Sequence, residues 1–261
     1  MNQIILSTNE RDLYVEFWKP VSWAYKKMFP DVTVHLAFLT NRPEDDELVK
    51  EFREYGKVTL FKPDPTYPEF GQAKMIRFIL ASQQGNDICY IDDIDLFPLS
   101  KLFITNKVNR RPLGHLLCVG GEVYDNKGTY PISQHTAEGW LFKKLINPND
   151  KTYSELLADW SRPGLYDYRE SLTTPLDWDK DSYFSDERLL RRLIKENNIP
   201  KFEMRRGYDN FMESTVDRFD WKIDKEKLMN HGYLNAHGIR PYELHKEKYE
   251  PLFEYINTYY P

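Results

Sequence analysis

Short apolar runs alternate with longer amphipathic stretches along the first third of the chain. The apolar runs cover Gln3–Ser7, Thr33–Leu39, Lys57–Phe61 and Asp87–Ile91. Runs of this length, rich in large and β-branched residues, predict buried strands. The stretches between them predict helices over residues 13–29, 43–55 and 71–84, the first interrupted or started at Pro20. Strands and helices that alternate in this way indicate βα units and a mostly parallel sheet.

The pattern is less regular beyond Pro98. Short β-like pieces at Gly114–Gly120 and Gly128–His135 alternate with predicted helices at Gly139–Ile146 and Tyr153–Trp160. An aromatic and charged stretch follows, and Ser185 is then the expected N-cap of a further helix. Because neither a linker rich in Gly or Ser nor an internal repeat divides the chain, we expect a single α/β domain over residues 1–261.

Composition narrows the classes of function. The 41% of hydrophobic residues allow a sizeable core, and the 15% of aromatic residues fit a protein that binds nucleobases or sugars. The net charge of −5 argues against a nucleic-acid partner, which requires a basic surface. Neither a secretory signal nor an apolar segment of membrane-spanning length is apparent, so we expect a cytoplasmic protein without a membrane span.

Three acidic residues follow the fourth predicted strand: Asp92, Asp93 and Asp95. Clustered carboxylates repel one another, and hard cations such as Mg²⁺ and Mn²⁺ take oxygen ligands of this kind. Asp93 and Asp95 lie two apart, so their side chains share a face of an extended segment. The simpler interpretation is an acidic exit from a strand. The buried strand before it and the Leu-Phe-Pro exit after it favour a metal site.

The segment Tyr90-Ile91-Asp92-Asp93-Ile94-Asp95-Leu96-Phe97 resembles the D-x-D strand end of GT-A type glycosyltransferases. The resemblance implies a GT-A-like fold, a Rossmann-type mixed, mostly parallel sheet flanked by helices. It implies Mn²⁺ or Mg²⁺ at Asp93 and Asp95, bridging the diphosphate of a nucleotide sugar, most often a UDP- or GDP-sugar. Residues 1–98 would form the nucleotide-binding half, and residues 99–261 would bind a glycan or other hydroxyl acceptor. The implied activity is metal-dependent, hexosyltransferase-like glycosyl transfer.

Two later segments extend the resemblance. Phe184–Leu190 is similar to the acidic helix start near the acceptor and donor sugar, which implies catalytic positions at Asp186 and Glu187. The simpler alternative is that both are ordinary acidic residues in the first turn of a helix, where the helix dipole favours negative charge. His237-Gly238 resembles the C-terminal histidine that completes the metal shell, with His231 as the other candidate. Flanking Gly and Pro predict that His237 lies on a tight loop, where Arg240 is a weaker candidate for contacting phosphate.

Other candidate residues surround the predicted strand ends. Lys74 and Arg77 share a helix face just before the acidic strand and are expected to reach the diphosphate or the donor sugar, unless they are ordinary surface cations. Positions after the first two strands commonly contact a base and ribose, and here they hold Thr8, Asn9, Arg11, Thr40 and Asn41. His135 and Glu138 are further candidates for the sugar pocket.

Three other classes of protein share some of these features. A metal-dependent nucleotidyltransferase uses a related sheet, but it more often has a Gly-rich loop after the first strand, and residues 7–11 contain no glycine. A dehalogenase-type phosphatase also has a D-x-D, but on an early strand. A non-catalytic carbohydrate-binding protein fits the aromatic content, so metal-dependent hydrolysis of a nucleotide sugar is the assay that separates it from a transferase.

Overall fold

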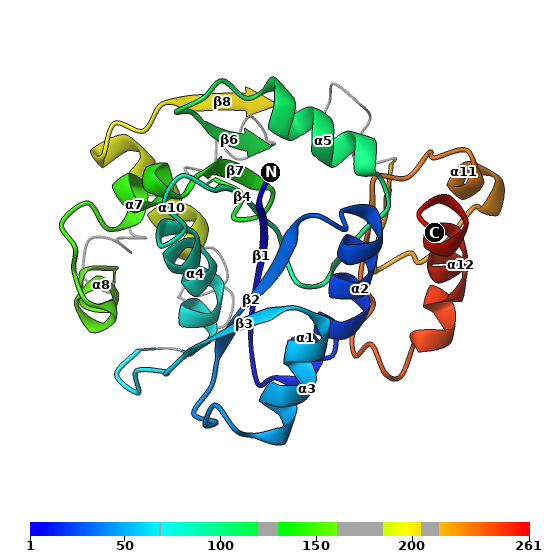
Figure 1. Cartoon of the computed structure of the whole chain (residues 1–261), viewed down its shortest axis with the longest axis horizontal. Coiled ribbons are helices and arrows are strands. Elements are labelled where there is room, and N and C mark those ends of the chain that lie inside the picture. Colours follow the sequence, from blue (N-terminus) through cyan, green and yellow to red (C-terminus); the bar gives the residue numbers. More distant parts are fainter. Residues whose placement is uncertain (68, 120–129, 161–184, 205–213) are drawn as a thin grey trace, which may run out of the picture.

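The computed structural model describes residues 1–67, 69–119, 130–160, 185–204 and 214–261 (Figure 1). Within them a seven-stranded sheet has the order β3-β2-β1-β4-β7-β6-β8. Its strands are β1 (Gln3–Asn9), β2 (Thr33–Leu39), β3 (Lys57–Phe61), β4 (Ile88–Ile91), β6 (Leu116–Val119), β7 (His135–Glu138) and β8 (Lys201–Met204). All pairings are parallel except those of β7, which runs antiparallel to β4 and to β6. The predicted mixed, mostly parallel sheet is confirmed.

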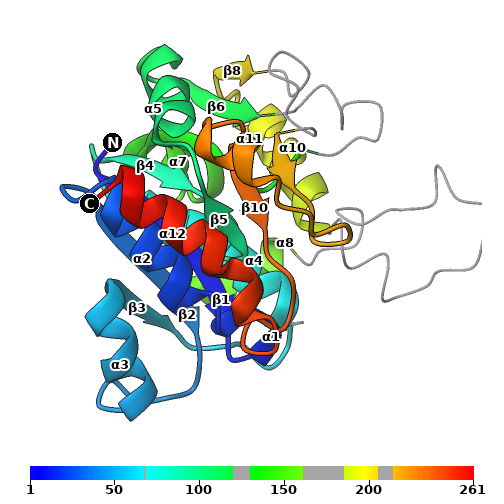
Figure 2. The same cartoon turned by 90° about the vertical axis from the view of Figure 1, so that its right-hand side faces the viewer.

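Helices cover both faces of the sheet (Figures 1 and 2). They are α1 (Asp12–Val15), α2 (Trp18–Met28), α3 (Glu47–Tyr55), α4 (Glu69–Ser82), α5 (Lys101–Arg110), α7 (Gly139–Ile146), α8 (Tyr153–Trp160), α10 (Ser185–Glu196), α11 (Lys225–Met229) and α12 (Glu250–Tyr259). Alternate side chains of β1 enter two cores: Ile5 packs with α4, α7 and α10, whereas Ile4 and Leu6 pack with α2, α3 and α12. The single domain therefore has three layers, with the sheet in the middle.

The first half of the fold follows the predicted elements closely. β2 and β3 have the predicted bounds, and β1 runs two residues further, to Asn9. The predicted helix over residues 13–29 is two helices, and Pro20 lies in the first turn of α2, where its missing N–H is tolerated. α3 begins later than predicted because the Asp46 side chain caps it, accepting from the Leu48 N–H at 2.9 Å.

The second half departs from the predictions in one strand. β6, α7 and α8 lie within or at the predicted bounds, but the strand predicted at Gly128–His135 is wrong. β7 begins at His135, and residues 130–134 before it are irregular, with a positive φ of 62° at Gln134. Residues 128 and 129 lie outside the described residues. Ser185, the expected N-cap, is the first residue of α10.

A second, three-stranded sheet ties the end of the chain to the acidic segment. It has the order β5-β10-β9, from β5 (Leu96–Pro98), β10 (Asn235–His237) and β9 (Thr215–Val216). The chain then runs through a short 3₁₀ helix, Lys246–Tyr249, into α12, which packs beside α2 (Figure 2). Among the described residues, we find no helix that is both long and apolar enough to cross a membrane.

Candidate active site

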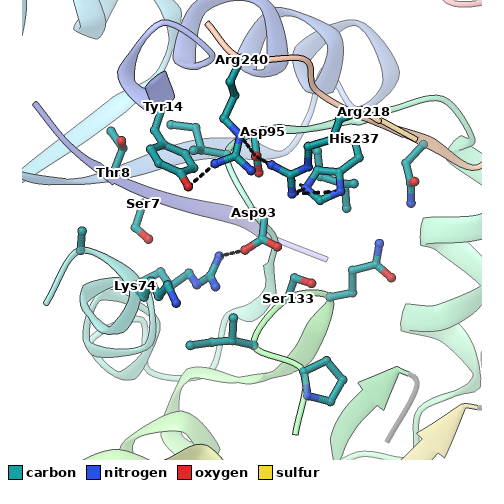
Figure 3. A pocket seen from close by; sticks show the side chains of 18 of the residues that line it. Ser7, Thr8, Tyr14, Lys74, Asp93, Asp95, Ser133, Arg218, His237 and Arg240 are labelled. Carbon is teal, nitrogen blue, oxygen red and sulfur yellow. Dashed lines mark hydrogen bonds and ion pairs between the residues drawn. The ribbon is translucent and has the colours of Figure 1, made fainter. Parts of the chain in front are cut away.

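A cavity of about 340 Å³ opens beyond the carboxyl ends of β1 and β4 (Figure 3). Ligands of open α/β sheets bind at this edge. Its polar lining comes from the end of β1, from α4, from the acidic segment, from the residue before β7, from α10 and from the tail. It includes Ser7, Thr8, Asn9, Lys74, Arg77, Asp93, Asp95, Gln134, Glu187, Asp217, Arg218, His237 and Arg240. In Figure 3, Asp95, Arg218, His237 and Arg240 gather on one side, and Asp93 lies between them and Lys74.

Nine of the predicted site residues line this cavity: Thr8, Asn9, Lys74, Arg77, Asp93, Asp95, Glu187, His237 and Arg240. Arg11 and Thr40 do not. Arg11 is exposed, and its guanidinium lies 5.9 Å from the ring centre of Phe70, which lines the cavity. Thr40 is buried, donates its hydroxyl hydrogen to Glu10, and accepts from the Arg42 N–H at 2.9 Å. The side chain of Asp186 lies outside the described residues.

His135 and Glu138 also lie away from the cavity and have structural partners. His135 is fully buried, and burial lowers its pKa to about 4 despite hydrogen bonds with the carbonyls of Pro131 and Leu117. Glu138 accepts two hydrogen bonds from Arg111, at 3.0 and 2.9 Å, in a buried ion pair. These contacts fix β7 in the sheet, and neither residue lines the cavity.

Asp92 resolves the register of the acidic segment because its side chain is buried under α2, away from the cavity. It accepts hydrogen bonds from the Tyr25 hydroxyl at 2.7 Å and from the Tyr90 hydroxyl at 3.1 Å. Burial, followed by the charge of Asp93, raises the pKa of Asp92 to about 7. Asp93 and Asp95 are therefore the two carboxylates of this segment that face the cavity.

Arg77 holds Asp93 in place. Its Nη1 atom lies 2.6 Å from Asp93 Oδ1 and donates to the backbone oxygen of Asp92 at 2.8 Å. The Arg77 side chain is only 3% exposed, so α4 does not present it to solvent as an ordinary surface cation. Arg77 is therefore not an ordinary surface cation, because its guanidinium is turned toward the acidic segment.

Asp95 is the centre of a positively charged group. Its Oδ2 atom lies 3.1 Å from Arg218 Nη1, 3.4 Å from Arg240 Nε and 3.6 Å from His237 Nε2. Burial alone would raise the pKa of Asp95, but the hydrogen bond and charge of His237 and the charge of Arg240 outweigh it and lower the pKa. Asp95 is therefore a carboxylate at neutral pH although it is 5% exposed.

The small sheet places His237 beside Asp95. β10 pairs with β5 so that His237 is opposite Leu96, and the Gly238 N–H donates to the Asp95 backbone oxygen at 2.7 Å. A Cβ atom on Gly238 would lie 2.4 Å from the Phe17 ring, so only glycine allows this close approach. The predicted tight loop at His237 is thus wrong: the residue belongs to a strand. His231 lies elsewhere, with Nδ1 2.6 Å from the Tyr255 hydroxyl.

The donor set of the cavity fits a divalent cation by its chemistry. Two carboxylates and an imidazole, from Asp93, Asp95 and His237, line the same space, and Mn²⁺ takes both kinds of ligand. Among the described residues, however, no three His, Cys, Asp or Glu side chains already lie at metal-binding distance. The carboxylates are turned to arginines instead, Asp93 to Arg77 and Asp95 to Arg218. Cation binding therefore requires these side chains to move.

Sequence reasoning missed several lining residues, among them Tyr14, Phe70 and Arg218. Tyr14 and Phe70 stand in α1 and at the start of α4, near the predicted strand ends, and aromatic residues at such positions were a usable signal. Arg218 gave no local signal. Its position depends on the pairing of β9 with β10, which joins distant segments of the chain.

Comparison with known proteins adds a likeness of fold. No family model matches the sequence, and no curated protein matches it. The galactosyltransferase LgtC, solved in complex with donor and acceptor sugar analogs, superposes with a TM-score of 0.50 and 9% identity over 98% of this chain and 95% of that one. An active-site mutant of LgtC superposes with a TM-score of 0.50 and 10% identity, over 90% of this chain and 86% of that one. The glycosyltransferase GlyE of Streptococcus pneumoniae TIGR4 superposes with a TM-score of 0.50 and 13% identity, over 99% of this chain and 62% of that one. The chain therefore has the fold of the GT-A type glycosyltransferases.

Proposed function

We propose that the protein is a glycosyltransferase that moves a sugar from a nucleotide-diphosphate sugar to an acceptor hydroxyl. The observation that carries this proposal is the content of the cavity: Asp93, Asp95 and His237 share it with Lys74, Arg77, Arg218 and Arg240. A diphosphate is a compact anion, and a cation together with several positive side chains is what stabilises it. The fold supports the proposal because LgtC has it and was solved with donor and acceptor sugar analogs.

In this proposal Asp93, Asp95 and His237 hold Mn²⁺ or Mg²⁺. Such an ion neutralises charge that develops on the leaving nucleoside diphosphate. Lys74 and Arg77 lie on α4, on the Asp93 side of the cavity, where they are placed to bind diphosphate oxygens or the donor sugar. Residues 1–98 then form the nucleotide-binding half, as the sequence predicts.

The end of β1 is the proposed site of the base and ribose. Thr8 and Asn9 line the cavity there, and the Asn9 side chain donates to Glu69 at 2.7 Å, which joins β1 to the start of α4. Tyr14 lies on the same side, beside Arg240. Arg11 and Thr40 stay predictions as donor contacts, since neither lines the cavity in the absence of ligand.

Glu187 is the proposed acid facing the reacting sugar. It lies in the first turn of α10 and lines the cavity, while its backbone oxygen accepts from the Tyr130 N–H at 3.0 Å. A carboxylate in this position can deprotonate an acceptor hydroxyl or stabilise the sugar as its bond to phosphate breaks. Asp186 remains its neighbouring alternative. The acceptor is then bound by the second half of the chain.

A donor panel tests the proposal. UDP-, GDP-, CDP- and dTDP-sugars are added with and without Mn²⁺, and the unfolding temperature is measured, since a ligand that binds the native state raises it. Release of the nucleoside diphosphate by the responding donor separates a transferase from a carbohydrate-binding protein. Release of pyrophosphate from a nucleoside triphosphate and a sugar phosphate would instead identify a nucleotidyltransferase. The cytoplasmic location stays a prediction.

A further inference from the structure

Arg218 makes an unusual pair of contacts inside the cavity. The residue follows β9, and its side chain is 12% exposed. Its Nη1 atom lies 3.1 Å from Asp95 Oδ2, while its Nη2 atom contacts both ring nitrogens of His237, with Nδ1 at 3.2 Å. Figure 3 shows the guanidinium against His237 and Asp95. Arg240 also reaches Asp95, but its Nη1 atom donates to the Tyr14 hydroxyl.

These contacts use the same atoms that a cation would use. A guanidinium group has only donors and no acceptor, so it binds an imidazole through the ring's lone pair and a carboxylate through its oxygens. Those are the electron pairs by which Asp95 and His237 would hold Mn²⁺. A divalent cation at the same place would lie within a few ångströms of the Arg218 charge and be repelled by it. Arg218 and the cation therefore exclude each other from this position.

Arg218 also keeps one donor unused. Its Nε atom is buried and has no hydrogen-bond partner among the residues that the structure describes, and the same holds for Nε of Arg77. Both arginines line the cavity. A buried donor without an acceptor is unfavourable. An anion with several acceptor oxygens, such as a diphosphate, supplies the missing partner when the guanidinium turns toward it.

We propose that Arg218 is a built-in counter-cation, which occupies the Asp95–His237 position in the empty protein and moves onto the diphosphate when metal and donor bind. The proposal rests on the metal site proposed above and adds a coupling between the binding of metal and the binding of nucleotide. Metal alone must displace a positive side chain and binds weakly. A nucleoside diphosphate gives Arg218 a new partner and strengthens metal binding, and by linkage the metal strengthens nucleotide binding to the same degree.

The test measures Mn²⁺ binding without nucleotide, by the electron paramagnetic resonance signal of free Mn²⁺. Arg218→Ala is expected to bind Mn²⁺ about tenfold more tightly than the wild type or better, since a coupling of this size is common. Arg218→Met, which keeps the length of the side chain without its charge, gives the same direction should the alanine variant not fold. Arg192→Ala is the control: it removes an exposed arginine of α10 that pairs with Glu196, and its Mn²⁺ affinity stays at the wild-type value.

Added guanidinium ion tests whether Mn²⁺ affinity depends on a cation at the Asp95–His237 position or on charge in general. Added to Arg218→Ala at a low, non-denaturing concentration, it is expected to refill the position and return Mn²⁺ affinity toward the wild-type value. Sodium at the same ionic strength does not. Mn²⁺ affinity that is unchanged or weaker in Arg218→Ala overturns the proposal. So does a guanidinium effect no larger than that of sodium.

Failure of this inference is distinguishable from failure of the metal site. If neither the wild type nor any variant lowers free Mn²⁺ below the value set by nucleoside diphosphate alone, the metal site itself is wrong. If the wild type binds Mn²⁺ and loses it on Asp95→Asn, but Arg218→Ala binds it no better, the site stands and the counter-cation does not.

Discussion

Asp95 Oδ2 lies 3.6 Å from His237 Nε2, although the two residues come from opposite halves of the chain. The antiparallel pair of β5 and β10 creates this proximity, because Leu96 follows Asp95 and is the register partner of His237. A hydrogen bond from Gly238 to the Asp95 backbone, at 2.7 Å, continues the pairing. The tail is thus an integral part of the fold, and it brings Arg218, His237 and Arg240 to Asp95.

Replacement of Asp93 or Asp95 is expected to remove metal binding in both cases but to lower stability by different amounts. Asp93→Asn and Asp95→Asn each remove a proposed ligand, so each should abolish Mn²⁺-dependent release of nucleoside diphosphate. Asp95→Asn should also lower the free energy of unfolding by about 3 kcal/mol, because it leaves buried positive groups without their charge partner. Asp93 is 35% exposed as a side chain and pairs with Arg77, so its variant should lose less. Urea unfolding of both variants shows which of them loses more free energy of unfolding.

Lys74→Ala is expected to weaken nucleoside diphosphate binding about fivefold to tenfold, the loss of one charged hydrogen bond, with little change in stability. Lys74 lines the cavity and its ammonium lies 4.2 Å from the ring centre of Phe70. Lys143→Ala is the matched control, because that lysine is half exposed, lies on α7 and pairs with Asp150. Calorimetric titration with UDP or GDP in the presence of Mn²⁺ measures both. Equal affinities in the two variants would remove Lys74 from the donor site.

Gly238→Ala and Gly71→Ala form a second matched pair. At Gly238 a Cβ atom would lie 2.4 Å from the Phe17 ring and 3.0 Å from the Tyr249 hydroxyl, so the tail must shift away from Asp95. At Gly71, inside α4, a Cβ atom meets nothing within 4 Å. We expect Gly238→Ala to lower the unfolding temperature and weaken Mn²⁺ binding. Gly71→Ala should be neutral or slightly stabilising, because alanine favours a helix. Similar losses in both would contradict the packing described for the tail.

His35 makes stability depend on pH at a place far from the cavity. It is 1% exposed on β2, and burial followed by the charge of Lys57 lowers its pKa to about 4. In the unfolded chain the pKa is about 6.5, so the stabilising contribution is complete above that value and is lost as pH falls toward about 4. At pH 5 the loss is about 2 kcal/mol.

His35→Gln removes this titration and can retain a hydrogen bond to the Thr59 hydroxyl, which His35 makes at 2.8 Å. The difference in the free energy of unfolding between pH 7.5 and pH 5 should therefore be smaller in the variant than in the wild type. Urea titrations at both pH values supply the comparison. An identical difference in the two proteins would show that His35 does not titrate in this range.

The elements that sequence reasoning placed well are those specified by neighbouring residues. β2 and β3 have apolar runs bounded by polar residues, and Asp93 and Asp95 lie two apart in the sequence, so local pattern located them. The start of β7 and the position of Arg218 depend on pairing between segments far apart in the chain. A single sequence carries little information on such pairing. The Tyr25 hydroxyl, a buried partner of Asp92, illustrates the same limit, because it belongs to α2, far from Asp92 in the chain.

Metal-dependent release of nucleoside diphosphate is the measurement that tests the central claim most directly. Wild-type protein is incubated with UDP- and GDP-sugars in Mn²⁺, in Mg²⁺ and after EDTA, with Asp93→Asn and Asp95→Asn alongside. The account predicts release from at least one donor with metal present, stopped by EDTA and absent in both variants. Release that continues unchanged in EDTA, or in both aspartate variants, would contradict the metal site at Asp93, Asp95 and His237. A protein that neither binds nor cleaves any nucleotide sugar would contradict the function itself.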